Sequence, residues 1–515
     1  MSEKDPLALV IDFGSQSVRL GATNLKGEII ALVKKPYDPV YVSSGPGLAE
    51  QDADFYWNRF IECAQEFRSK YSNLFERAIG ITLTSFRDTA VLLDKNMKPI
   101  RPCIHWLDQR LAKPAKELLP FWKKFLFKLV RMEETLILNR RKTMAIWYQQ
   151  NEPDNWKNTV KYASFPSYMH YKLCGRLADS PSNFTGHFPI DYKTGKWYKN
   201  EKPLKNIFNI PIHLMPEIVR QGEIIGSITK EASFITGLPA GIPIYSGGSD
   251  KSCETLGVGA LDSNIGSLSY GTSCTIEVSN KKYHEPEPFL PAYQSCLPDI
   301  YNMEVQIYRG YWMLTWFTKE FAQHESTEAA IGNMMAEEVL NAKMMQIAPG
   351  CNGLVLQPYW GAGLRRPVAR GGIIGFNDGH TKIHLYRAIL EGIAYALREG
   401  LEGIEKSQKQ KITELRVSGG GSQSDAICQI TADIFGRPVS RVQTYETSTL
   451  GGAIALFIAS GYFKTPSEAV ASMVHPSRTF LPNPDAQQKY EYLYTHVYTK
   501  MYGKLKNIYA DLKDF

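Results

Sequence analysis

Two segments far apart in the chain share one plan, in which a short apolar strand runs into glycine, hydroxyl and carboxylate residues. The first is Val-Ile-Asp-Phe-Gly-Ser-Gln-Ser at residues 10–17, and the second is Ile-Pro-Ile-Tyr-Ser-Gly-Gly-Ser-Asp at residues 242–250. A third glycine and hydroxyl turn, Tyr-Gly-Thr-Ser, follows at residues 270–273. Glycine turns free backbone N–H groups to surround phosphate, and a carboxylate at a strand end is placed to act as a base. The plan predicts an α/β chain whose strand-end turns meet at a phosphate site.

Strands and helices alternate along the first half and restart in the second. Strand patterns at Leu7–Ile11 and Ile79–Thr84 flank a helical pattern at Asp54–Lys70, and Ile265–Val278 reads as a hairpin. A chain of 515 residues is too long for one core, so we expect two large domains. The glycine-rich stretch at 236–248 predicts domains over residues 1–248 and 249–480, followed by a C-terminal docking helix over 481–515.

Composition argues against several other classes of protein. The net charge of +7 is spread along the chain without a long basic run, so we expect no nucleic acid partner. The eight cysteines are scattered without a Cys-x-x-Cys pair, which favours neither a disulfide framework nor a zinc site. The sequence leaves the oligomeric state open, with a homodimer among the alternatives.

Nothing in the sequence predicts a membrane protein. The first six residues carry acids and run directly into the strand at Leu7–Ile11, so we expect no apolar region of a signal peptide. No apolar run approaches the roughly 18 residues that span a bilayer. Residues 121–132 have the pattern of an amphipathic helix, with aromatic and aliphatic side chains on one face and lysines and an arginine on the other. Such a helix could rest on a membrane surface, but it more often packs its apolar face on its own domain. We expect a cytoplasmic protein.

A series of motifs in the right order resembles the FGGY carbohydrate kinases over essentially the whole chain. In chain order they are Asp12–Arg19, Arg101–Arg110, Trp147 with Asn151-Glu152-Pro153, Gly371–Phe376 followed by His384–Glu391, Ser418–Ser424, Gln429–Val439 and Leu450–Ala453. Three positions depart from the family pattern: Met144 stands where a lysine is usual, Phe376 where Ile, Leu or Val is usual, and Asn24 where an acid is often found. Met144 puts one contact of the substrate domain in doubt.

The resemblance implies two ribonuclease-H-like domains of the actin-like ATPase type, with a central cleft that binds ATP, Mg²⁺ and a small sugar or polyol. Phosphoryl transfer needs a held triphosphate, a metal ion and a base for the acceptor hydroxyl. Asp250 would be that base, although it could also cap the helix that follows. The resemblance and the turns together assign phosphate contacts to Gly14, Ser15, Gln16, Ser17, Arg19, Gly271 and Thr272, adenosine contacts to Gly420, Gly421 and Ser424, and Mg²⁺ to Asp12, through water, and Asp250.

Substrate recognition is expected in the first domain, at Arg87, Asp88, Trp106 and Asp108, with Asp250. An arginine beside a carboxylate offers donors and acceptors to neighbouring hydroxyls. The Arg87-Asp88 pair resembles the Arg-Glu pair of glycerol kinases and autoinducer-2 kinases more than the Met-His pair of xylulokinases, and residues 178–183 also resemble the autoinducer-2 kinases.

We expect an ATP-dependent kinase that phosphorylates a hydroxyl of a small sugar or polyol. A ketopentose such as xylulose or ribulose is the first candidate substrate, and glycerol and 4,5-dihydroxy-2,3-pentanedione are the alternatives. A sugar sensor without activity is the alternative class, and it would be expected to lack the base or a phosphate turn.

Overall fold

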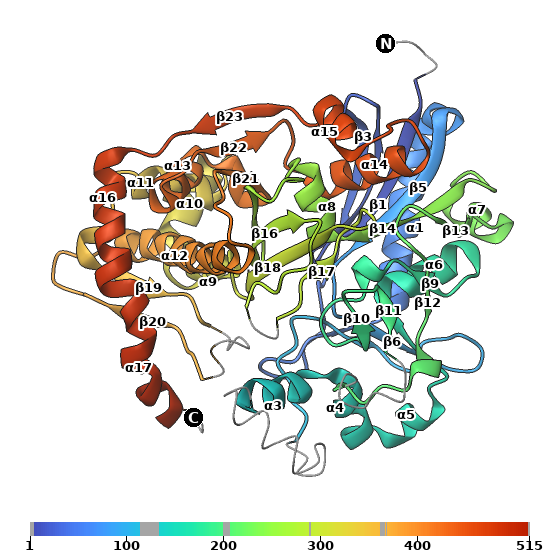
Figure 1. Ribbon diagram of the computed structural model, residues 1–515, viewed down its shortest axis with the longest axis horizontal. Coiled ribbons are helices and arrows are strands. Elements are labelled where there is room, and N and C mark those ends of the chain that lie inside the picture. The colour runs from blue at the N-terminus through green and yellow to red at the C-terminus, as the bar shows by residue number, and fades with distance from the viewer. Residues whose placement is uncertain are drawn as a thin grey trace.

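The computed structural model describes residues 5–113, 133–198, 207–287, 290–360, 366 and 368–512. Within them the chain forms two large mixed sheets, each with helices packed beside it (Figure 1), and five small two-stranded sheets. The amphipathic helix predicted at 121–132 lies outside the described residues.

The first half holds a six-stranded sheet with the order β13-β14-β5-β1-β2-β3. Strand β1 runs antiparallel to β2 and parallel to β5, and β14 continues the parallel side. The elements of this half are β1 (Leu7–Phe13), β2 (Ser17–Thr23), β3 (Ile29–Pro36), β4 (Glu50–Gln51), α1 (Ala53–Tyr71), β5 (Ala78–Ser85), β6 (Ala90–Leu93), β7 (Cys103–Ile104), α3 (Glu133–Lys142), α4 (Met144–Asn151), α5 (Pro153–Asn158), β8 (Lys161–Ser164), α6 (Phe165–Cys174), β9 (Ala178–Asp179), β10 (Ile190–Asp191), β11 (Lys196–Trp197), β12 (Glu217–Ile218), β13 (Ile224–Ser227), α7 (Lys230–Thr236) and β14 (Pro243–Ser249).

The second half holds a seven-stranded sheet with the order β17-β18-β16-β15-β21-β22-β23. Its elements are α8 (Asp250–Gly257), β15 (Ile265–Tyr270), β16 (Cys274–Asn280), β17 (Tyr293–Gln294), β18 (Tyr301–Ile307), α9 (Trp312–Phe321), α10 (Gln323–Ile331), α11 (Ala336–Met344), β19 (Val355–Gln357), β20 (Gly372–Ile374), α12 (Lys382–Gln408), β21 (Glu414–Ser418), α13 (Asp425–Phe435), β22 (Val439–Val442), α14 (Thr447–Ala459), α15 (Pro466–Met473), β23 (Pro476–Phe480), α16 (Pro484–Leu493) and α17 (Thr499–Asp511). The division into domains at residue 248 stays a prediction.

The two sheets repeat one topology. As β1 pairs antiparallel with β2 and parallel with β5, so β15 pairs antiparallel with β16 and parallel with β21. The counterpart of the turn at 14–16 is therefore the hairpin turn after β15. Residues 242–250, which share the pattern of residues 10–17, form β14 and lead into α8 instead of a hairpin. The same strand and glycine pattern thus serves two different connections.

Helices α8 and α14 lie between the two sheets and pack closely against each other (Figure 1). Their contact requires glycine on both sides. A Cβ at Gly451 would stand 1.8 Å from the carbonyl oxygen of Cys253, and one at Gly257 would stand 2.0 Å from that of Thr447. Because backbone meets backbone here, α8 is held rigidly, and the residue at its start is fixed with it.

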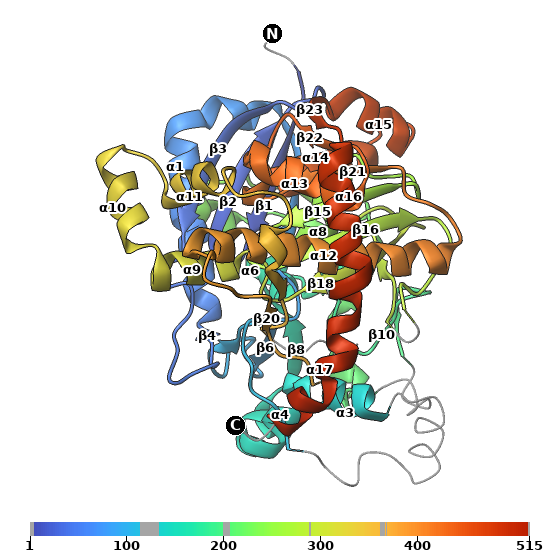
Figure 2. The ribbon, with the colours of Figure 1, turned by 90° about the vertical axis from the view of Figure 1, so that its left-hand side faces the viewer.

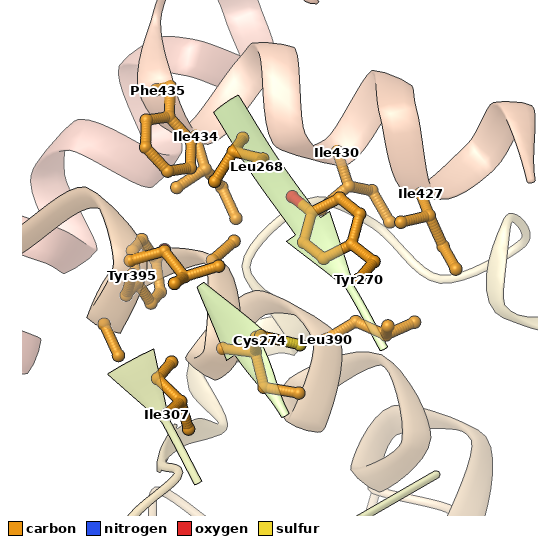
Figure 3. Packing of buried hydrophobic residues seen from close by; sticks show 14 of the residues in the cluster. Leu268, Tyr270, Cys274, Ile307, Leu390, Tyr395, Ile427, Ile430, Ile434 and Phe435 are labelled. Carbon is orange, nitrogen blue, oxygen red and sulfur yellow. The ribbon is translucent and has the colours of Figure 1, made fainter. Parts of the chain in front are cut away.

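The core of the second half is packed between α12 and α13. Figure 3 shows Ile427, Ile430 and Ile434 of α13 beside Leu268 and Tyr270 of β15, which belong to one buried cluster. The hydroxyl of Tyr270 finds a partner in this apolar setting, because it lies 2.6 Å from Oγ1 of Thr431. The last strand residue before the second glycine turn is thereby anchored in the core.

The C-terminal helices α16 and α17 form a long column along one side of the second half (Figure 2). Asn483 caps the start of α16 and Pro484 is its first residue, as the sequence predicted. The column packs buried Tyr490, Tyr494 and Tyr498 around Tyr395 of α12. No helix in the described part of the chain is long and apolar enough to cross a bilayer.

Candidate active site

A cleft of about 1090 Å³ lies between the two halves and collects the predicted site residues from both. Those that line it are Asp12, Gly14, Ser15, Gln16, Ser17, Arg19, Arg87, Asp88, Trp106, Asp250, Gly271, Thr272, Gly420 and Gly421. Two others lie outside its lining. Asp108 accepts hydrogen bonds from Arg110 and from the N–H of Ala49, and Ser424 caps α13 by accepting from the N–H of Ile427. Because neither residue lines the cleft, their binding roles stay predictions.

The first predicted phosphate turn is the hairpin between β1 and β2. The N–H of Gly14 donates to the carbonyl of Ser17 at 3.0 Å and closes the turn. Behind it, Arg19 forms ion pairs with Asp12 at 3.1 Å and with Glu446, just before α14, at 2.9 Å. The arginine is therefore held in place by two carboxylates, and its position is set before any anion reaches the cleft.

The second turn, between β15 and β16, faces the first. Its carbonyl groups at Gly271 and Thr272 accept hydrogen bonds from the N–H groups of Tyr311 and Trp312 at the start of α9. Across the cleft, Nε2 of Gln16 donates to Oγ1 of Thr272 at 3.1 Å. The two turns therefore meet, as a shared polyphosphate site would require.

Asp250 is the first residue of α8 and lines the cleft. Ser249, and not Asp250, is the cap of this helix, because its side chain accepts from the N–H of Ser252. Oδ1 of Asp250 accepts from the N–H of Lys251 at 2.8 Å. Burial raises the pKa of Asp250, while the charges of Lys251 and Arg87 oppose that rise. A carboxylate with this environment and an open face to the cleft can accept a proton from a bound hydroxyl.

Lys251 is a feature of the site that sequence reasoning missed. Its Nζ donates to Glu254 at 2.9 Å and to Oγ of Ser269 at 2.8 Å. Burial disfavours its charge, but Glu254 and Asp250 outweigh burial and raise its pKa. A fixed cation therefore stands directly after Asp250.

Asp12 ends β1 with only 2% of its surface exposed. Burial, which outweighs the favourable charge of Arg19, raises its pKa to about 7. One carboxylate oxygen, Oδ1, is buried without a hydrogen-bond partner among the described residues. No group of three or more His, Cys, Asp or Glu side chains in the described residues could hold a metal ion by itself. An acceptor left open in this way fits a cation that takes most of its ligands from phosphate and water, as Mg²⁺ does.

At the other end of the cleft, Arg87 points to residues of the second half. Its Nη1 lies 2.7 Å from Oε2 of Glu304 and its Nη2 donates to Oε1 at 2.9 Å, while its Nε lies 3.9 Å from Oδ1 of Asp250. The sequence had paired Arg87 with its neighbour Asp88. In the structure Asp88 has a positive φ of 57° and its carboxylate bonds instead to His187, at 2.7 Å to Nδ1 and 3.0 Å to the backbone N–H.

Glu304 could have been suspected from its strand. Both β16 and β18 carry a glutamate among apolar residues, in Cys-Thr-Ile-Glu-Val and Asn-Met-Glu-Val, and the two acids stand opposite each other in register. A buried acid inside a strand demands a partner, although the sequence could not identify Arg87 as that partner.

Aromatic side chains and one indole donor complete this end. Tyr293 lies under the guanidinium of Arg87, with 5.6 Å between Cζ and the ring centre, and Tyr192 and Tyr308 also line the cleft. The indole N–H of Trp106 is buried and has no hydrogen-bond partner among the described residues. Such a donor in a cleft lining is available to a hydroxyl oxygen.

At the predicted adenosine end, the glycines have different surroundings. A Cβ at Gly421 would lie 2.0 Å from the ring of Tyr311, which stacks on Tyr270. Nothing lies within 4 Å of the Cβ position at Gly420, and Gly419 has a positive φ of 77°. Glycine at 421 therefore makes room for an aromatic side chain of the protein, and the open side at Gly420 is the one that could admit a nucleotide.

The segment at 178–183, which resembled the autoinducer-2 kinases, is buried and does not line the cleft. Asp179 accepts hydrogen bonds from Ser164, Asn183 and the N–H of Ser180. These contacts give the segment a structural role beneath the cleft.

Comparisons with known proteins identify the family of this chain. Residues 7–257 match the N-terminal domain model of the FGGY family of carbohydrate kinases, and residues 266–460 match its C-terminal domain model. The uncharacterized sugar kinase YgcE of Escherichia coli K12 is 28% identical over 483 residues, which cover 93% of this chain and 90% of that protein. The xylulose kinase of Lactococcus lactis is 26% identical over 514 residues and 98% of both chains.

Among solved structures, the gluconate kinase of Lactobacillus acidophilus superposes with a TM-score of 0.80 at 22% identity. The match covers 98% of this chain and 100% of that one. At this identity the likeness establishes the fold, which is that of two-domain sugar kinases.

Proposed function

Because the chain belongs to the FGGY family of carbohydrate kinases, we propose that it transfers the γ-phosphoryl group of ATP to a hydroxyl of a small sugar or polyol, with a ketopentose such as xylulose or ribulose as the first candidate. The observation that carries this proposal is the cleft itself, where two facing glycine turns and Asp250 surround one space. The relatives named xylulose kinase support the choice of ketopentose.

In the proposed mechanism, the turns at 14–17 and 271–272 bind the triphosphate from opposite sides. Asp250 accepts the proton of the acceptor hydroxyl as its oxygen attacks the γ-phosphorus, and the bond to the β-phosphate oxygen breaks. Asp12 would hold Mg²⁺ through water, with Asp250 nearby, and the ion would neutralise charge on the phosphates. Lys251 keeps a positive charge beside Asp250, which favours its ionised form before proton transfer.

Short polyols form the second candidate class, and Arg87 favours them. Its guanidinium offers several N–H donors at the base, which suits a substrate made of little more than neighbouring hydroxyls. Glycerol and 4,5-dihydroxy-2,3-pentanedione therefore belong in the same screen.

The test is a coupled assay of ADP release with ATP, Mg²⁺ and a panel of ketopentoses, pentitols, glycerol and 4,5-dihydroxy-2,3-pentanedione. We expect ADP release that depends on one class of sugar and that is lost in Asp250→Asn. ADP release that is the same with and without every sugar would refute a carbohydrate kinase of this kind.

A further inference from the structure

We infer that Glu304 completes the sugar site together with Arg87, and that this pair selects an uncharged substrate with a hydroxyl next to the one that is phosphorylated. The inference rests on the proposed function, because it specifies which carbohydrates the same cleft accepts.

The pair joins the two halves of the chain. Arg87 follows β5 in the first half and Glu304 lies in β18 of the second half, 217 positions later, yet two N–H groups of Arg87 meet the two oxygens of Glu304. Both side chains line the cleft, with 12% and 5% of their surfaces exposed. A paired fork of this kind fixes both groups in a single geometry. The acceptor side of the sugar site is therefore supplied by the second half of the chain.

A second buried glutamate, Glu277, lies beside Glu304 in the sheet. Glu277 stands opposite it in β16, and its Oε2 accepts from Oγ1 of Thr255 at 2.9 Å and from Nδ2 of Asn302 at 2.8 Å. Burial and the neighbouring charge of Glu304 raise the pKa of Glu277. Burial also disfavours the charge of Glu304, but the charge and the hydrogen bond of Arg87 outweigh burial and lower the pKa of Glu304. Glu304 is thus the ionised member of the two.

The pair leaves hydrogen-bonding groups available to a substrate. An arginine has five N–H donors, and Arg87 uses two of them on Glu304. Its Nε lies 3.9 Å from Oδ1 of Asp250, so its donors reach the place beside the base. Glu304 lines the cleft with 5% of its side chain exposed, and a carboxylate oxygen can accept more than one hydrogen bond. A hydroxyl both donates and accepts, so a hydroxyl bound by this pair would be the neighbour of the hydroxyl held by Asp250.

The charges around the pair disfavour an anionic substrate. The two cations nearest the pair already face carboxylates: Arg87 faces Glu304, and Lys251 faces Glu254. A sugar acid bound at the pair would bring its carboxylate next to Glu304 and Asp250, and neither Arg87 nor Lys251 is an unpaired cation that could receive it. Desolvating that charge costs free energy that a hydroxymethyl group does not require. The cleft therefore favours neutral polyols and ketoses over aldonates.

The decisive variant is Glu304→Gln, which keeps the shape and leaves Arg87 with an unbalanced charge. For the best neutral substrate we expect KM to rise at least about tenfold, while KM for ATP changes less than about twofold. The ratio of kcat/KM for the aldonate of the same carbon number to that for the neutral substrate should rise at least about tenfold. A gain toward the acid is a readout that loss of stability cannot produce.

Glu405→Gln is the matched control. Glu405 is a buried carboxylate with an ion pair to Arg437 at 2.7 Å, and it does not line the cleft. We expect it to lower thermal stability without changing the ratio of acid to neutral substrate. A similar change of the ratio in both variants would overturn the role of Glu304.

Measurements on the unmodified protein keep the inference testable if Glu304→Gln does not fold. Wild-type enzyme should lose at least about tenfold in kcat/KM when the hydroxyl next to the phosphorylated one is replaced by hydrogen. A wild type that prefers an aldonate, or that turns over the deoxy analogue equally well, would refute the inference while leaving the kinase in place. A wild type without any sugar-dependent ADP release would instead refute the proposed function.

Discussion

Gln16 and Thr272 are 256 positions apart in the sequence, and the side chain of Gln16 donates a hydrogen bond to the hydroxyl of Thr272 at 3.1 Å. This bond joins the hairpin turn of the first sheet to the equivalent turn of the second. It spans the phosphate end of the cleft, as the contact between Arg87 and Glu304 spans the sugar end. The two halves are therefore linked by side chains at both ends of the proposed site.

Gln16→Ala is expected to raise KM for ATP by about twofold to tenfold, because a hydrogen bond contributes a net ~0.5–1.5 kcal/mol and this one aligns the two turns. KM for the sugar should change little. The measurement is steady-state kinetics with each substrate varied in turn. Gln65→Ala removes a hydrogen bond to Ile235 on the surface of the first half and serves as the control. Equal effects on both substrates would contradict a role confined to the phosphate turns.

Asp250→Asn keeps the size of the side chain and removes the proton acceptor. Loss of a general base costs ~10²–10⁴ in turnover, so kcat should fall by that amount. Nucleotide affinity, measured by titration calorimetry, should remain. The exposed Asp262→Asn is a control of the same chemistry away from the cleft. Near-normal turnover of Asp250→Asn would refute its assignment as the base.

Arg87→Ala is expected to raise KM for the sugar at least about tenfold, since it leaves buried Glu304 without its partner and removes donors from the substrate at ~1–3 kcal/mol. ATP affinity should change much less. Titration calorimetry with each ligand separates the two effects. If the affinity for ATP falls as much as the affinity for the sugar, Arg87 does not act as a sugar contact.

Closure of the cleft should need both ligands, because the two phosphate turns belong to different sheets and water must leave the space between them. We expect small-angle scattering to give a smaller radius of gyration with sugar plus a non-hydrolysable ATP analogue than with either ligand alone. The same radius under all conditions would show a cleft that stays closed. Gln16→Ala should reduce the difference if the contact to Thr272 contributes to closure.

The buried Asp179 predicts a pH dependence of stability. Burial, opposed by hydrogen bonds from Asn183, Ser180 and Ser164, raises its pKa to about 7 from 3.8. Between pH 4 and 7 the folded protein keeps a proton that the unfolded chain has lost, so the free energy of unfolding falls as pH rises through this window. Three pKa units correspond to about 4 kcal/mol as an upper limit.

Asp179→Asn removes this titration and keeps the acceptor oxygen. Relative to wild type, the variant should gain stability as pH rises, with the full difference reached above pH 7 and little difference near pH 4. Urea unfolding between pH 4 and 8 measures it. His170, 3.5 Å away, remains in both proteins. Parallel stability curves for the two proteins would show that Asp179 is ionised in the folded state throughout.

The sequence alone determined the elements that carry the site. The strand and glycine turns at 10–17 and 270–273, the acid at 250 and the helix that begins at Pro484 are fixed by local rules of backbone geometry, and the structure places the first three around one cleft. The order of the family motifs also predicted the two-domain sugar kinase fold. Such features could be predicted from the sequence because each depends on residues close together in the chain.

Only the tertiary structure decided which side chains face each other. Asp88 is adjacent to Arg87 in sequence, but the positive φ of Asp88 turns its carboxylate to His187, while sheet register and closure of the halves bring Glu304 to Arg87. The same holds for Asp108, which is occupied by Arg110, and for residues 178–183, which are buried. Contacts across more than two hundred residues depend on how the sheets pack, and no local pattern of residues contains that information.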